Sequence, residues 1–352
     1  MTLAMPIEAE TLSAAPPALT PQMAARLARS HFGLAPAEVL PLTAERDQNL
    51  LLRCEDGTAF VMKVANPGEA RSITDFQTAA LRHLESAAPG LPVPRIRRTL
   101  DGAGEAIAPL PDGRLSVVRV LNWLEGQPLV HAPHSPRQRE NLARCLAGLG
   151  RAFADVSHPG QDHYLQWDIS HLDRLAPLMP AIDDERARAA VAAVLDDFTA
   201  IALPALPALR RQVIYNDLNF HNVLVDPAEP DRVAGIIDFG DIIAAPLVND
   251  VAVAASYQFG AEAARDHVAE FVAAYHRELP LRAEEIRLLP LLIEARLAMT
   301  LLITGYRARL HPENAAYILR NNASARAALL MLRAASARDN LDWIMTALEE
   351  RR

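Results

Sequence analysis

Residues 213–240 read V-I-Y-N-D-L-N-F-H-N-V-L-V-D-P-A-E-P-D-R-V-A-G-I-I-D-F-G, and the order of apolar and polar residues here is the most informative feature of the chain. Three short apolar runs are separated by polar loops, a pattern typical of short buried strands. Asp217 follows the first run, Asn222 stands five positions later at the start of the second, and Asp238 ends the third. The pattern therefore predicts three polar side chains held at strand ends.

These three side chains suit phosphate chemistry. Two carboxylates and one amide oxygen are hard oxygen ligands, which Mg²⁺ takes together with water and substrate phosphates. In phosphoryl transfer, one carboxylate orients the attacking hydroxyl while metal ligands and a lysine neutralise the phosphate oxygens. The order D-x-x-x-x-N followed by D-F-G is that of protein kinases. The alternative is that Asp217 and Asn222 are turn residues and Asp238 is a helix cap, but the joint spacing favours catalysis.

A lysine in the N-terminal third supports this interpretation. Lys63 lies inside the apolar run F-V-M-K-V at 60–64. An ammonium group that points inward from such a strand needs an anion, and a nucleotide phosphate would serve. The alternative is an outward-facing lysine on an edge strand.

The distribution of patterns along the chain predicts two lobes. Two apolar runs, at 48–54 and 58–64, flank an Asp56-Gly57 turn and predict a β-hairpin. A helix is expected after Thr20 and another over 68–88, whereas alanine-rich helical segments dominate from about residue 136. We therefore predict an α+β, bilobal fold with a small antiparallel β-rich N-lobe and a larger, mainly helical C-lobe. The expected divisions are a flexible N-terminal arm at 1–20, a nucleotide-binding N-lobe at 21–121, and a C-lobe at 122–352 that carries the catalytic loop and the acceptor site.

Composition and charge exclude several other classes. The 352 residues are 51% hydrophobic and 22% charged, which is ordinary globular material. A net charge of −8 opposes binding to nucleic acid, and two cysteines cannot build a disulfide framework. The longest apolar stretch, at 286–305, contains charged residues and reads as a buried helix. No signal peptide fits the N-terminus. We expect a cytoplasmic protein with no membrane or nucleic-acid partner.

Several motifs resemble those of the aminoglycoside phosphotransferase family, small-molecule kinases with a protein-kinase-like fold, and within it those of the hydroxylysine kinases. They are F-V-M-K-V-A-N (60–66), V-V-R-V-L-N-W-L-E-G-Q-P-L (117–129), N-D-L-N-F-H-N-V-L-V (216–225), G-I-I-D-F-G-D (235–241) and R-L-H-P-E-N-A-A-Y (309–317). The resemblance covers most of the chain.

The resemblance implies a role for each residue. Asp217 would be the catalytic base, Asn222 and Asp238 the Mg²⁺ ligands, and Lys63 the contact to the α- and β-phosphates. The backbone near Val120 and Leu121 would hydrogen-bond the purine. The donor would be ATP or GTP, and the acceptor a hydroxyl of a small amine or amino acid, hydroxylysine-like. Acceptors of the aminoglycoside, homoserine or ethanolamine type are the alternative.

The chain departs from the family pattern at three places. Tyr215-Asn216 replaces the usual His-Gly before the catalytic aspartate, and the loop expected to cover the phosphates has Gln48 and Asn49 in place of glycines. Gln77 stands on the inward face of its helix, where relatives often carry the glutamate that pairs with the lysine. We expect Gln77, rather than Asp75, to be the neighbour of Lys63. These departures motivate a second hypothesis, a nucleotide-binding pseudoenzyme, but retention of Asp217, Asn222 and Asp238 argues against it.

Other polar residues are candidates for the acceptor side. Asp241 could contact a cationic acceptor or a second metal, or serve only in a turn. Arg296 could bind an amino-acid carboxylate in a bidentate manner or pair with another helix. Trp167 could form the floor of the acceptor pocket or belong to the core. Asp250, at the expected start of a helix, is predicted to hold the catalytic loop in place.

Overall fold

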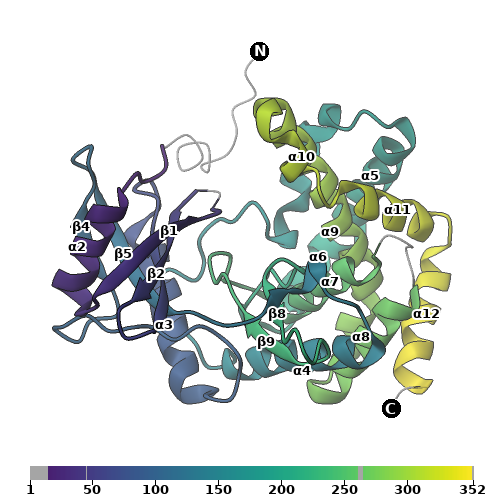
Figure 1. Ribbon diagram of the computed structural model, residues 1–352. Helices are drawn as coiled ribbons and strands as arrows, with labels where there is room; N and C mark the ends of the chain where they lie inside the picture. The colour runs from purple at the N-terminus through teal and green to yellow at the C-terminus, as the bar shows by residue number, and fades with distance from the viewer. Residues whose placement is uncertain (1–14, 45, 261–264, 351–352) are drawn as a thin grey trace. The chain divides into compact units, whose positions relative to one another are not determined.

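The computed structural model describes residues 15–44, 46–260 and 265–350, and the chain divides into two compact units (Figure 1). The first unit runs to Gly126 and also takes in residues 156–164 and 234–240, and the second contains the rest. The predicted division after residue 121 thus differs from the observed one. The later segments join the first unit through specific contacts. For example, the backbone N–H of Ile236 donates to the carbonyl of Pro92 at 2.7 Å.

A five-stranded antiparallel sheet forms the centre of the first unit. Its strands, in spatial order, are β1 (Pro36–Leu42), β2 (Gln48–Cys54), β3 (Ala59–Val64), β5 (Leu115–Asn122) and β4 (Ala106–Pro109). The predicted hairpin is confirmed: β2 pairs with β3, and Gly57 adopts a φ of 84° in the turn, which favours glycine. Lys63 lies on β3, opposite Asn49 and Arg119 of the neighbouring strands.

The described residues of the first unit also form two helices, α2 (Pro21–Phe32) and α3 (Arg71–Ala87). Helix α2 begins as predicted, because the Thr20 side chain accepts a hydrogen bond from the N–H of Met23 at 3.2 Å. Residues 1–14 of the predicted arm lie outside the described residues. Farther along, Leu19 is buried, and its N–H and C=O both pair with the side-chain amide of Gln48, at 2.8 and 2.9 Å. This part of the arm is therefore held against β2.

The second unit is mainly helical, as predicted. Its α-helices are α4 (Pro136–Ala152), α5 (Glu185–Asp197), α6 (Leu203–Ala205), α7 (Leu247–Gln258), α8 (Arg265–Glu278), α9 (Ala283–Leu310), α10 (Ala315–Ile318), α11 (Asn322–Arg333) and α12 (Ala337–Glu350). A 3₁₀ segment, η2 (Ile169–Ala181), packs on α9. Short strands accompany them: β6 (Gln127–Pro128) pairs with β8 (Val223–Val225), and β7 (Arg211–Ile214) with β10 (Ile243–Pro246). Strand β9 (Val233–Ile236) leads the chain back into the first unit.

Helix α9 is the centre of the second unit. It has 28 residues and packs against α7, α11, α12 and η2, so the predicted buried helix at 286–305 is confirmed (Figure 1). A different helical run, Glu185–Ala208, is long and apolar enough to cross a membrane by length and composition. Its first helix, α5, packs against α9 and α11, and core helices of globular proteins share this composition.

Candidate active site

The loop predicted to be catalytic connects β7 to β8 in the second unit, and its side chains hold both carboxylate oxygens of Asp217. The side-chain amide of Asn222 donates to Oδ2 of Asp217 at 2.6 Å, and that of Asn219 donates to Oδ1 at 3.0 Å. The Asp217 side chain is 21% exposed. The carboxylate is therefore oriented by two neutral donors while part of it stays accessible.

The same contacts leave one atom of Asn222 available. Its Nδ2 group donates to the Asp217 side chain and backbone, so Oδ1 faces away from that residue, and it accepts no hydrogen bond from the described residues. A free amide oxygen suits a metal ligand. Across the described ranges, no group of three or more His, Cys, Asp or Glu side chains could hold a metal. A metal bound at this site would need water and phosphate oxygens as further ligands.

A buried arginine contacts the predicted catalytic base. Nη2 of Arg296, on α9, lies 3.6 Å from Oδ1 of Asp217, and the residue is only 2% exposed. Its Nη1 donates to the carbonyl of Trp167 at 3.0 Å, and the guanidinium stacks on the Trp167 ring, with 4.7 Å to the ring centre. Burial alone would lower the pKa of Arg296, but Tyr257 and Asp217 outweigh burial and raise it. The group stays cationic.

This position changes the expectation for the acceptor-side residues. Arg296 is buried and occupied by Asp217 and Trp167, so its predicted contact with an acceptor carboxylate is not supported by its surroundings. Trp167 is half-buried and holds the guanidinium. Asp241 lies close enough to Arg296 to contribute to its raised pKa.

The start of the catalytic loop is held by a buried acid. Asp250, in the first turn of α7, accepts hydrogen bonds from the backbone N–H groups of Tyr215 (3.2 Å) and Asn216 (2.7 Å). This confirms the predicted tie between Asp250 and the loop. Burial raises the pKa of Asp250 to about 7, although the two N–H donors lower it.

Asn216 stands where the family resemblance implies a glycine, and it adopts a left-handed backbone conformation. Its φ is 65°, in the left-handed region that glycine and, less readily, asparagine adopt. Its side chain is fully buried, and neither amide atom has a hydrogen-bond partner in the described protein. The loop is therefore formed, but it carries an unsatisfied amide beside Asp217.

In the first unit, Lys63 pairs with the aspartate of the D-F-G sequence. The Lys63 Nζ to Asp238 Oδ1 distance is 2.9 Å, and the Lys63 side chain is 12% exposed. Burial lowers the pKa of Lys63, but the Asp238 and Asp47 carboxylates outweigh it and leave that pKa above its ordinary value. The charge of Lys63 lowers the pKa of Asp238 in turn. Oδ2 of Asp238 has no partner among the described residues, and the side chain is 49% exposed, so this oxygen can accept a metal.

Gln77 has a different partner from the one predicted. It is 2% exposed, as expected for the inward face of α3, but its amide donates to the carbonyl of Gly240 at 3.0 Å and accepts from Arg119 at 2.7 Å. The acidic partner of Lys63 is Asp238, and within the described residues Gln77 makes its hydrogen bonds to Gly240 and Arg119 and not to Lys63. Asp75 is exposed, as expected.

A small pocket in the first unit is lined by Lys63, Leu81, Pro94, Arg119, Leu121, Asp238, Phe239 and Gly240. Leu121, one of the predicted nucleotide contacts, lines this pocket. Val120 does not: it is fully buried, and its carbonyl accepts from the N–H of Arg97 at 2.8 Å. This carbonyl thus already accepts one hydrogen bond, and a purine contact from the backbone near Val120 and Leu121 stays a prediction. Gln48 cannot cover phosphates as predicted, because its amide is bound to Leu19.

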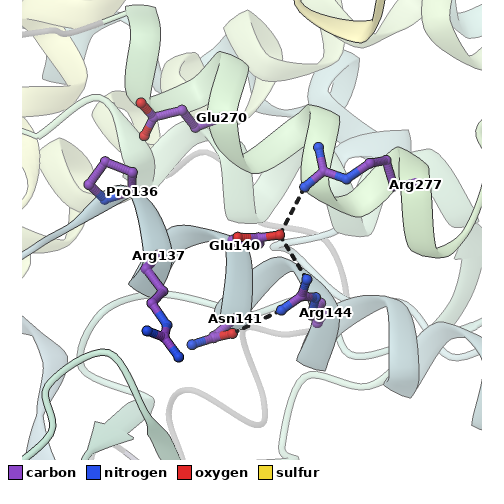
Figure 2. Close-up of a pocket in the computed structure, with 7 residues that line it drawn as sticks. All are labelled: Pro136, Arg137, Glu140, Asn141, Arg144, Glu270 and Arg277. Atoms are coloured by element: carbon purple, nitrogen blue, oxygen red, sulfur yellow. Dashed lines mark hydrogen bonds and ion pairs between the residues drawn. The ribbon is translucent and has the colours of Figure 1, made fainter. Parts of the chain in front are cut away.

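A second pocket lies on the second unit, between α4 and α8, and contains none of the predicted catalytic residues. Figure 2 shows Glu140 between Arg144 and Arg277, with Nη2–Oε1 distances of 2.8 and 3.0 Å. Glu270 completes the wall and pairs with Arg139. Apart from Arg137, the charged side chains that line this pocket take part in ion pairs, as in a surface ion-pair network.

Sequence reasoning missed three contributors to the site. Asn219 and Arg119 lie within the motifs at 216–225 and 117–129. The D-x-N spacing at 217–219 is a local signal for a side chain that folds back onto Asp217. Tyr257 carries no such signal. Its hydroxyl accepts from Arg296 at 3.4 Å only because α7 and α9 pack together.

Two features of the site, in a chain whose five-stranded sheet is followed by a helical region, define a small-molecule phosphotransferase. One is the lysine paired with the D-F-G aspartate, and the other is the loop that holds an oriented aspartate. The chain belongs to the Phosphotransferase enzyme family (APH), whose model matches residues 9–286.

Relatives of known activity support the same class. The chain is 26% identical to hydroxylysine kinase of Mus musculus over 334 residues, which cover 88% of each protein. Its fold is similar to that of amicoumacin kinase in complex with AMP-PNP, Ca²⁺ and Ami (TM-score 0.66, 15% identity, 93% of this chain and 96% of that one). It is also similar to a microcompartment-associated aminopropanol kinase (TM-score 0.64, 19% identity, 88% and 97%). At these identities the structures support the fold alone.

Proposed function

We propose that this kinase transfers the terminal phosphoryl group of Mg–ATP or Mg–GTP to the hydroxyl of a small amino alcohol or hydroxyamino acid, with 5-hydroxylysine as the first acceptor to test. The observation that carries the proposal is the oriented Asp217 carboxylate, held by Asn219 and Asn222. The relationship to hydroxylysine kinase over 88% of both chains supports the choice of acceptor.

Each residue has a defined task. Lys63 would neutralise the nucleotide phosphates, and Asp238 and Asn222 would each supply one metal ligand through the oxygen that lacks a protein partner. When bound, Mg²⁺ would neutralise charge on the transferring phosphate. Gln77 would keep the backbone of Gly240 in place and so fix the direction of the Asp238 side chain.

The chemical step needs little from the protein beyond position. The acceptor oxygen forms a bond to the terminal phosphorus, the bond from phosphorus to the bridging oxygen of the nucleotide breaks, and the electron pair leaves with the nucleoside diphosphate. Asp217 orients the hydroxyl and receives its proton. We further propose a cytoplasmic location, where the nucleotide donor is abundant.

The test is a product assay with purified protein, Mg²⁺ and either ATP or GTP. 5-Hydroxylysine, homoserine, ethanolamine and an aminoglycoside are offered separately, and phosphomonoester formation is followed by ³¹P NMR. We expect the highest kcat/KM with 5-hydroxylysine. A higher value with another acceptor would replace hydroxylysine in the proposal. Nucleotide binding without transfer to any acceptor would support the pseudoenzyme hypothesis.

A further inference from the structure

A second cationic group lies beside the catalytic loop. Arg320 stands in the turn between α10 and α11, and its Nε donates to Nε2 of His221 at 3.2 Å. Its guanidinium stacks on the ring of Tyr317, with 4.0 Å to the ring centre, and Nη1 donates to the Tyr317 carbonyl at 2.9 Å. The group is thus held in one orientation while remaining at the surface.

Arg320 differs from the neighbouring arginines in having no acidic partner. Arg309 pairs with Asp183, Arg326 with Asp184, and Arg333 with Asp197, at 2.7, 3.1 and 2.7 Å. Within the part of the chain that the structure describes, Arg320 makes no ion pair, and its Nη2 group donates no hydrogen bond. Stacking and two hydrogen bonds hold this guanidinium without neutralising it, an arrangement that suits an anion supplied from outside the protein.

Hydrogen bonds through His221 and Asn219 link Arg320 to the proposed catalytic base. His221 directly precedes Asn222, and its backbone N–H donates to Oδ1 of Asn219 at 2.8 Å. Asn219 in turn holds the carboxylate of Asp217. The other arginine near the base, Arg296, is buried and already engaged, so Arg320 is the better placed of the two for a ligand.

We propose that Arg320 binds the carboxylate of an amino-acid acceptor, with His221 and Tyr317 holding the guanidinium in position. The inference rests on the proposed function and makes it narrower: the acceptor is a hydroxyamino acid, not a simple amino alcohol. A planar guanidinium can bind a carboxylate through parallel N–H bonds, which an ammonium cannot do. The hydroxyl is then directed to Asp217 while the carboxylate is recognised at the far end of the loop.

The test uses acceptors in matched pairs that differ only in the carboxylate. The pairs are 5-hydroxylysine with 1,5-diaminopentan-2-ol, and homoserine with 3-aminopropan-1-ol. We compare wild type with Arg320→Met and Arg320→Lys, and with Arg338→Met as a control, because Arg338 is an exposed arginine on α12. In the wild type, the carboxylate-bearing member of a pair should have the higher kcat/KM.

Arg320→Met should reduce kcat/KM for the carboxylate-bearing acceptor by about 10- to 100-fold, as expected for a lost charged hydrogen bond. The effect should fall on KM, and the decarboxylated partner should change by less than about threefold. Arg320→Lys should recover part of the loss, and Arg338→Met should resemble wild type. Equal losses for both members of a pair, or no loss, would overturn the inference.

The two proposals can fail separately. If hydroxylysine is not phosphorylated but homoserine is, and Arg320→Met removes the preference for the carboxylate, the arginine site stands and the hydroxylysine assignment falls. If the wild type prefers the decarboxylated member of every pair that it phosphorylates, the arginine site is wrong while the kinase activity stands.

Discussion

Nη2 of Arg296 lies 3.6 Å from Oδ1 of Asp217, so the proposed catalytic base is paired with a buried cation. The arginine comes from α9 and is fixed by the Trp167 carbonyl and ring, while the aspartate comes from a loop. Arg296 of α9 and the amide of Asn219 therefore hold one oxygen of the base, and the amide of Asn222 holds the other.

Removing the Arg296 charge should impair turnover more than nucleotide binding. We expect Arg296→Met to lower kcat by about 10- to 100-fold, because Asp217 loses one of its orienting groups. The free energy of unfolding should also fall, since a buried ion pair is broken. Arg296→Lys should retain more activity. Steady-state kinetics at saturating nucleotide would check this, and an unchanged kcat in a folded Arg296→Met protein would show that the pair has no role in catalysis.

Lys63 is expected to act on the nucleotide. Lys63→Met should raise the Kd for Mg–ATP or Mg–GTP and lower kcat, since phosphate neutralisation is lost and Asp238 loses its 2.9 Å partner. Isothermal titration calorimetry and kinetics would measure both effects. Arg53→Met is the matched control, because Arg53 is an exposed cation on the adjacent strand β2. Equal nucleotide affinity in wild type and Lys63→Met would contradict the assignment.

Asp250 should make stability depend on pH. Its pKa is about 7 in the folded protein, against an ordinary value of 3.8, so between these pH values the folded state binds more protons than the unfolded state. Asp250 therefore contributes to the free energy of unfolding at low pH. This contribution, on the order of 4 kcal/mol, is lost as the pH rises toward 7. Asp250→Asn should remove this component. We expect the Tm of wild type to fall more steeply than that of the variant between pH 5 and pH 7.5, and parallel curves would refute the assignment.

The unsatisfied amide of Asn216 predicts a stabilising substitution. Asn216→Gly keeps the left-handed φ of 65° and removes two buried polar atoms without partners. The gain from removing an unsatisfied amide, about 1–3 kcal/mol, should exceed the entropic cost of glycine, about 0.5–1 kcal/mol. Urea unfolding should show a net increase of about 1 kcal/mol. Asn216→Ala, which keeps a Cβ at this φ, should be less stable than Asn216→Gly, and the reverse order would contradict the explanation.

Local patterns were sufficient for much of the fold, and they also led to the roles proposed for the polar residues of the site, which stay predictions. Alternation and the Asp56-Gly57 turn predict the β2–β3 hairpin, and helical periodicity places Gln77 on the buried face of α3. The order of Asp217, Asn222 and Asp238 predicts their roles because these residues lie in one short region of the chain.

Partners distant in sequence could not be predicted in this way. Arg296 meets Asp217, and Arg320 meets His221, only because helices far along the chain fold back on the catalytic loop. A side chain can also bind a nearby group of the protein in place of the partner expected from the sequence. Gln48 binds the backbone of Leu19, and Gln77 binds Gly240 and Arg119. Such competition among polar groups is set by packing and has no periodic signal.

The central claim is that Asp217 directs phosphoryl transfer to the hydroxyl of a small acceptor. The most direct test is ³¹P NMR of a reaction containing Mg²⁺, ATP or GTP and 5-hydroxylysine, with wild type and Asp217→Asn compared at equal nucleotide occupancy. We predict a new phosphomonoester signal with wild type and a rate about 10²- to 10⁴-fold lower with Asp217→Asn, while both proteins bind nucleotide. Transfer by Asp217→Asn within tenfold of the wild-type rate would contradict the account.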